Sequence, residues 1–152
     1  MWFLPTRRRI ELLTQFLHSA IETGISTPGR ILVQKDEFLE LRDEYEAIKL
    51  PEGWEYKLTI SDGMGGKIRE FDWKQYEWVG WVVDDLVART ERFDQLLLAG
   101  LNGKNFVSAY DGGQKPTRMC VPIFSRKLLE AVGYIYPPGF WHTYVDDVWE
   151  AL

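Results

Sequence analysis

Short apolar runs alternate with longer segments of helical periodicity along the chain, and this alternation constrains the fold more than any other feature. The runs are too short for helices and are bounded by proline, glycine or charged residues. Between them, apolar residues recur every three or four positions, which is the spacing of an amphipathic helix. Strands that alternate with helices are typical of right-handed crossovers. The sequence therefore predicts an α/β domain with a mostly parallel sheet flanked by helices.

The apolar spacing also places the individual elements. Three glycines, Gly63, Gly65 and Gly66, are expected to form a flexible turn where the backbone can approach a ligand closely. Residues 136–142 contain two prolines and a glycine and cannot be regular. The predicted strands are residues 2–4, 31–33, 56–60, 78–83, 105–110 and 118–124. The predicted helices are residues 10–21, 38–48, 93–101 and 125–131, and a last helix that starts at the pair Asp146 and Asp147.

Length, charge and composition limit the class of protein. The 152 residues fit one compact domain, residues 1–152, which can bury a core without disulfides. A net charge of −5 argues against general binding of nucleic acid. The single cysteine, Cys120, agrees with a reducing compartment, and no segment has the length of a membrane span or a signal peptide. We therefore expect a cytoplasmic protein.

Two adjacent carboxylates, Asp84 and Asp85, follow the predicted strand 78–83. Negative charge at the rim of a sheet must be relieved by a cation, a proton or a basic side chain. This rim is also where α/β proteins bind ligands. The alternative is structural, because one aspartate can cap the next helix while the other is solvated. The run Arg7, Arg8 and Arg9 likewise fits either a small anion or a solvated helix start.

The order of these pieces resembles the GT-A glycosyltransferases, in particular the family 2-like nucleotide-diphospho-sugar transferases. The matching segments are Leu4-Pro5-Thr6-Arg7, the segment GWVVDDLVART at residues 80–90, and the closing PPGFWHTYVDDVW at residues 137–149. The resemblance runs in order from the first strand to the end of the chain. It implies a GT-A-like, Rossmann-like sheet, and a metal-dependent transfer of a sugar from a nucleotide-diphosphate donor to an acceptor that stays open at this stage.

The resemblance also implies roles for residues near the donor. Thr6 and Arg7, with Arg9 in the same basic run, match the position that receives the base and ribose, and Asp36 matches an acidic position that hydrogen-bonds one of them. Asp84 and Asp85 match the DxD-like element, in which one carboxylate faces the ribose and the other binds Mn²⁺ or Mg²⁺ on the diphosphate. Because no residue separates the two aspartates, their division of roles stays open.

The late segment is implied to complete the reaction. Asp146 or Asp147 matches the acidic residue that accepts a proton from the acceptor hydroxyl in inverting members, although both also suit a helix start. His142 is either a further metal ligand or an ordinary loop histidine. Trp141 is expected to line the sugar or acceptor pocket.

Three hypotheses about function remain, and the first is the metal-dependent sugar transferase. Many GT-A enzymes continue beyond the late acidic helix, so a chain of this length fits a compact, phage-type member or a shortened one. A non-catalytic GT-A-like nucleotide-binding or assembly module is the alternative to a transferase. A nucleotidyltransferase is a third reading, and the lack of glycine in residues 5–9 argues against it.

Overall fold

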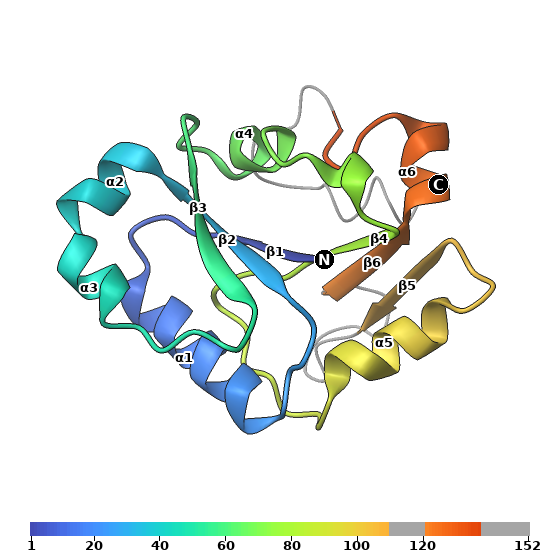
Figure 1. Ribbon diagram of the computed structural model, residues 1–152, viewed down its shortest axis with the longest axis horizontal. Coiled ribbons are helices and arrows are strands. Elements are labelled where there is room, and N and C mark those ends of the chain that lie inside the picture. Colours follow the sequence, from blue (N-terminus) through green and yellow to red (C-terminus); the bar gives the residue numbers. More distant parts are fainter. Residues whose placement is uncertain (110–120, 138–152) are drawn as a thin grey trace.

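A mixed sheet forms the centre of the computed structural model, which describes residues 1–109 and 121–137 (Figure 1). Within these residues the sheet has six strands in the order β3-β2-β1-β4-β6-β5. The first four are mutually parallel, whereas β6 runs antiparallel to both β4 and β5. The strands are β1 (Trp2–Pro5), β2 (Gly29–Gln34), β3 (Trp54–Thr59), β4 (Trp78–Trp81), β5 (Phe106–Ala109) and β6 (Val121–Ser125).

Helices cover both faces of this sheet. In Figure 1, α1 and α5 lie below the sheet, and α4 and α6 lie above it. The predicted α/β class is therefore confirmed. The helices are α1 (Ile10–Glu22), α2 (Lys35–Glu40), α3 (Arg42–Glu46), α4 (Met64–Arg69), α5 (Phe93–Leu101) and α6 (Arg126–Val132), with a short 3-10 turn at Trp73–Gln75.

The alternation of side chains along β1 divides the core into two layers. Trp2 and Leu4 pack with α1 and α5 on one face, while Phe3 packs with α4 and α6 on the other. All three side chains are fully buried. Buried on both faces, β1 reads as a continuous apolar run, as strands of parallel sheets do.

Most of the tryptophans in the described part of the chain belong to this core. Trp2, Trp54, Trp73 and Trp81 are buried, as expected for large aromatic side chains. Glycine makes room for one of them, because a Cβ at Gly80 would lie 2.4 Å from the Trp2 ring. The lack of a side chain at Gly80 therefore lets the Trp2 ring pack against β4.

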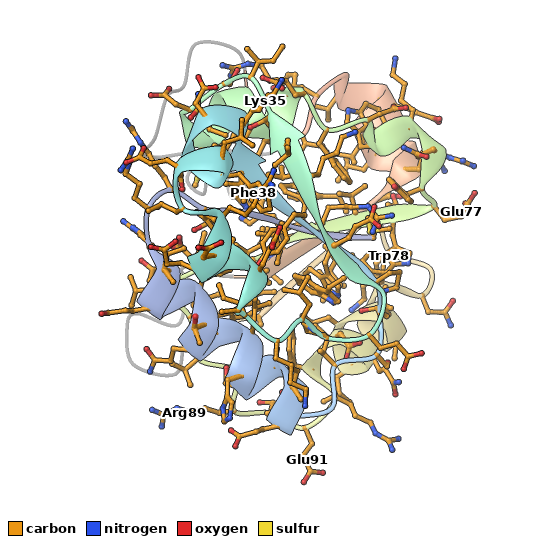
Figure 2. All side chains as sticks on the ribbon, turned by 60° about the vertical axis from the view of Figure 1, so that its left-hand side comes forward. Lys35, Phe38, Glu77, Trp78, Arg89 and Glu91 are labelled. Carbon is orange, nitrogen blue, oxygen red and sulfur yellow. The ribbon has the colours of Figure 1, made fainter. Side chains whose placement is uncertain are left out.

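The expected helix at residues 38–48 is wrong as a single element. The chain forms α2 and α3 instead, and they are separated at Leu41, whose φ of −111° and ψ of 32° leave the helical region. The helix starts earlier than expected because the Gln34 side chain accepts a hydrogen bond from the Glu37 amide. The break lets Tyr45 turn inward and stack on Phe38, whose ring also contacts Tyr56 of β3. Phe38 is labelled on α2 in Figure 2.

The expected flexible turn at Gly63, Gly65 and Gly66 is also wrong in part. Gly65 and Gly66 lie inside α4, and only Gly63 precedes it, as the N-cap. Close packing explains Gly66, because a Cβ there would lie 2.5 Å from the Ser61 Cβ atom. Gly66 therefore allows α4 to pack closely on the loop before it and does not serve as a flexible hinge.

Candidate functional site

A cleft of about 330 Å³ opens at the carboxyl ends of β1 and β4. The chain runs from β1 to β2 on one side and returns to β4 on the other side of β1, so this edge is a topological switch point. Ligands of open α/β sheets bind at such points. The lining residues are Pro5, Thr6, Arg7, Arg9, Asp62, Gly63, Met64, Lys67, Val83, Asp84 and Asp85.

Asp84 is the buried acidic group of the cleft, with 4 % of its surface exposed. Its Oδ2 atom accepts a 2.7 Å hydrogen bond from the Thr6 hydroxyl. Its Oδ1 atom lies 3.0 Å from Nη1 of Arg9. Three of the residues predicted from the sequence thus come together across the junction of β1 and β4, and both oxygens of Asp84 have partners within the protein.

Asp85 is exposed, and its Oδ2 atom lies 3.5 Å from the same Arg9 nitrogen. The hydrogen bond to Asp84, followed by the charge of the two carboxylates, raises the pKa of Arg9. The repulsion expected between the two aspartates is therefore relieved by a basic side chain. Because its contact with Arg9 is long and its side chain faces solvent, Asp85 is the more available carboxylate.

Lys67 also lines the cleft, although the sequence did not indicate it as a site residue. Only 1 % of its surface is exposed, and its Nζ atom donates a hydrogen bond to the Thr6 carbonyl oxygen. Burial lowers its pKa, although the Glu37 carboxylate acts in the opposite direction. Lysine is ordinarily a surface residue, so nothing in the helical pattern marked this one as buried. Its burial follows from the packing of α4 against β1, which brings Nζ to the Thr6 carbonyl.

The charges of the lining balance. Arg7, Arg9 and Lys67 contribute positive charge, and Asp62, Asp84 and Asp85 contribute negative charge. Asp62, which the sequence had not singled out, pairs with Arg7 at 3.2 Å, and both side chains are about two-thirds exposed. A pair this exposed contributes little stability and separates easily. Arg7 is thus available to a polyanionic ligand.

Asp36 lies apart from the cleft. It is exposed in the first turn of α2 and is not among the lining residues. Its Oδ2 atom lies 3.4 Å from the side-chain nitrogen Nε2 of Gln34. The neighbouring Glu37 is buried and accepts a hydrogen bond from the Arg8 amide at 2.6 Å. Of the adjacent pair Asp36 and Glu37, it is therefore Glu37 that contacts the β1–α1 loop.

Part of the predicted site lies outside the described residues. This applies to Trp141, His142, Asp146 and Asp147, and also to Cys120. The structure therefore shows the surroundings of the earlier site residues, from Thr6 to Asp85, whereas the roles expected for them and for the late segment stay predictions.

The carboxylate oxygens in the cleft suit a hard divalent cation whose other ligands come from a bound molecule. No group of three or more His, Cys, Asp or Glu side chains within residues 1–109 and 121–137 could hold a metal ion by itself. Mg²⁺ typically needs only one or two carboxylates when phosphate and water supply its other ligands. Since Asp84 is engaged by Thr6 and Arg9, Asp85 is the residue that fits such an ion.

The chain matches known proteins by its structure and not by its sequence. No family model matches the chain, and no curated protein matches it by sequence. A mannosyltransferase from Pyrobaculum calidifontis, solved with GDP-Man and Mn²⁺, superposes with a TM-score of 0.67 at 15 % identity, over 99 % of this chain and 50 % of that one. TarS from S. aureus gives 0.65 at 12 % identity, over 98 % and 53 %.

A 4-diphosphocytidyl-2C-methyl-D-erythritol synthase from Anaerococcus prevotii gives a TM-score of 0.57 at 12 % identity, over 91 % of this chain and 77 % of that one. The chain therefore has the GT-A-like fold of nucleotide-diphospho-sugar transferases, as its sequence predicted. It spans about half the length of the solved mannosyltransferase chain and of the solved TarS chain, which is TarS 1–349. Along the described residues, no helix combines the length and apolar character needed to cross a membrane.

Proposed function

We propose that this chain is the nucleotide-sugar-binding domain of a metal-dependent, inverting glycosyltransferase. The observation that carries the proposal is the pairing of a buried, fully engaged Asp84 with an exposed Asp85 in the cleft at the switch point. The GT-A-like fold of the structural neighbours supports the same class of reaction.

The electrostatics of the cleft favour a ligand that arrives with a cation. A nucleoside diphosphate carries several negative charges, whereas the described lining balances its own. A phosphate oxygen could be contacted by Arg7, Arg9 or Lys67 only if the present hydrogen bonds or ion pairs of these side chains weakened. A divalent ion on Asp85, either Mn²⁺ or Mg²⁺, would supply the missing positive charge and stabilise the diphosphate as it leaves.

The proposed division of roles follows from burial. Asp84 and Thr6 hold the floor of the donor site, and Arg7 and Arg9 flank the nucleotide. For Asp36 we propose a contact with the base or ribose at the outer rim, which requires the donor to extend past the lining residues. His142 remains a candidate for a further metal ligand.

The transfer step needs a base, and we propose Asp147, or its neighbour Asp146, for that role. The acceptor hydroxyl oxygen attacks the anomeric carbon, the bond from that carbon to the diphosphate oxygen breaks, and the hydroxyl proton passes to the carboxylate. Attack opposite the leaving group inverts the anomeric centre. Replacing Asp147 with Asn should spare donor binding and abolish transfer, and full activity of that variant would assign the role to Asp146 or to another group.

The donor site can be tested by thermal stability against a panel of nucleoside diphosphates with and without Mn²⁺. A ligand that binds only the native state stabilises it by about 2.7 kcal/mol at a hundred times its Kd. For a chain of this size that corresponds to roughly 5–10 °C in Tm. We expect a Mn²⁺-dependent shift with one nucleotide.

Variants at three aspartates make the test specific. Asp85→Ala should remove the Mn²⁺-dependent part of the shift while the fold stays near wild type. Asp43→Ala, an exposed aspartate on α3 outside the cleft, makes the same charge change and should keep the shift. Asp36→Ala tests the contact proposed at the rim. An unchanged Mn²⁺-dependent shift in Asp85→Ala would refute the metal assignment.

A nucleotide-binding or assembly module without turnover is the second candidate. It is favoured by Arg9, whose guanidinium contacts both carboxylates and competes with a cation for them. In that case a nucleotide would raise the Tm equally with and without Mn²⁺, and no transfer product would form with any sugar donor.

A further inference from the structure

We infer that Glu37 is a positioning residue for the donor site, because it holds the backbone of Arg8 and thereby sets the loop that carries Arg7 and Arg9. The inference deepens the proposed function and rests on it for the identity of the ligand. Its structural basis is the loop of residues 6–9, which connects β1 to α1 and forms one wall of the cleft.

Arg8 has a backbone conformation that side chains with a Cβ atom rarely adopt. Its φ is +50°, and Arg92 is the only other non-glycine residue in the described part of the chain with a positive φ. This left-handed conformation brings Cβ too close to the backbone and costs energy. Such strain persists only where the surroundings hold it, and it concentrates at ligand-binding sites.

Glu37 supplies the main restraint. Its carboxylate, 4 % exposed, accepts the Arg8 amide hydrogen bond at 2.6 Å and a hydrogen bond from the Tyr45 hydroxyl through the same oxygen. Tyr45 is itself fully buried and stacked on Phe38, and its carbonyl accepts a 2.7 Å hydrogen bond from Tyr56. The acceptor for the strained peptide is thus fixed by a packed aromatic cluster.

The Arg8 side chain adds a second restraint from the same helix. Its guanidinium pairs with both carboxylate oxygens of Glu40, with one of the two contacts at 3.1 Å. The planar fork of arginine makes this arrangement directional. The pair is more than half exposed, so it guides the side chain, whereas the partly buried bond from the Arg8 amide to Glu37 holds the main chain.

The loop is held from the other side as well. The Thr6 carbonyl accepts a hydrogen bond from Lys67 of α4, and the Thr6 hydroxyl donates to Asp84 beyond β4. Between these anchors and Glu37, the chain direction at residues 7–9 is determined. Loss of the Glu37 anchor lets Arg8 relax to negative φ, which rotates the peptides on both sides and moves the guanidinium of Arg9 away from Asp84.

The test combines amide hydrogen exchange by NMR with the Kd of the nucleoside diphosphate that raises the wild-type Tm most. The variants are Glu37→Ala, and Glu37→Gln, whose amide oxygen can still accept the Arg8 bond. In Glu37→Ala we expect the Arg8 amide to exchange about tenfold faster, and the Kd to rise about tenfold, the size of one hydrogen bond to a charged group. In Glu37→Gln, both the exchange rate of the Arg8 amide and the Kd should return most of the way to their wild-type values.

Two controls separate positioning from general destabilisation. Glu44→Ala removes an exposed charge from α3, and Gly29→Ala destabilises the far end of β2, where a Cβ would lie 2.4 Å from the Trp54 ring. Neither should change the Kd. Unchanged Arg8 exchange in Glu37→Ala, or faster exchange with an unchanged Kd, would overturn the inference. If no nucleoside diphosphate bound the wild-type chain, the proposed function and the link to a donor site would fail, while Arg8 exchange would still decide whether Glu37 holds the loop.

Discussion

Asp94 is expected to be the most sensitive polar side chain of the described fold. It lies in the first turn of α5 with no exposed surface, and its Oδ2 atom accepts four hydrogen bonds from the loop between α1 and β2. The donors are the amide and hydroxyl groups of Ser26, at 3.0 and 3.2 Å, and those of Thr27, at 3.0 and 2.9 Å. One carboxylate oxygen therefore joins α5 to a loop that is far away in the sequence.

This loop also seats two buried tryptophans. The Trp2 indole donates to the Thr27 hydroxyl at 2.7 Å, and the Trp54 indole donates to the Thr27 carbonyl at 3.0 Å. Removing the carboxylate leaves two backbone amides short of an acceptor and loosens both rings. A hydrogen bond to a charged group contributes about 1.5–3 kcal/mol, and several on one oxygen are not additive. We therefore expect Asp94→Ala to lower the free energy of unfolding by about 3 kcal/mol, or roughly 6–12 °C in Tm.

The pH dependence provides an independent check. Burial acts to raise the pKa of Asp94, but the hydrogen bonds from Ser26 and Thr27 outweigh it, so the pKa lies below its usual 3.8. The unfolded chain then binds the proton more readily than the folded one. The stabilisation by Asp94 is present above pH 3.8 and is lost as the pH falls through the lower folded value.

Urea denaturation followed by tryptophan fluorescence, at neutral pH and at successively lower pH, measures both effects. Asp94→Asn keeps the shape of the side chain and removes its charge, so its deficit relative to wild type should shrink as the pH falls. A loss below about 1 kcal/mol in Asp94→Ala, the size of an ordinary surface effect, would refute the reasoning. So would a deficit of Asp94→Asn that does not change with pH.

Three further outcomes are expected. Gly80→Ala should lower the free energy of unfolding by about 1–3 kcal/mol through overlap with the Trp2 ring, while Gly63→Ala, where a Cβ meets nothing within 4 Å, should be close to neutral; equal urea midpoints would contradict the packing argument. Arg8→Gly should be about 1 kcal/mol more stable than Arg8→Ala in the same assay, because both lose the Glu40 pair and only glycine relieves the positive φ; a more stable Arg8→Ala would show that no strain is present. Burial raises the pKa of Tyr56 to about 12, so its contribution is complete below pH 10 and is lost as the pH rises from 10 to 12; Tyr56→Phe should flatten this alkaline decline, and an unchanged decline would assign it to other groups.

The residues of the candidate cleft could be predicted only in part. The end of the strand at residues 78–83 indicates Asp84, the resemblance to GT-A enzymes implies Thr6 and Arg9, and the structure brings these three together. Their roles in binding a donor stay predictions. Lys67 and Glu37 were missed because their residue types are usually exposed, and burial of a charged side chain depends on partners that lie elsewhere in the chain. Asp36 and Glu37 are adjacent, and the hydrogen bonds that Arg8 and Tyr45 donate to the Glu37 carboxylate accompany its burial, whereas Asp36 stays exposed.

The sequence by itself determined the α/β class, the order of the six strands described, and the position of the aspartate pair after a buried strand. These properties follow from local periodicity, which a single chain displays directly. Tertiary structure alone decided the break between α2 and α3, the helix that contains Gly65 and Gly66, and the strained loop at Arg8. Each of these depends on a contact between segments distant in the sequence, whose energy outweighs the local preference of the residues involved.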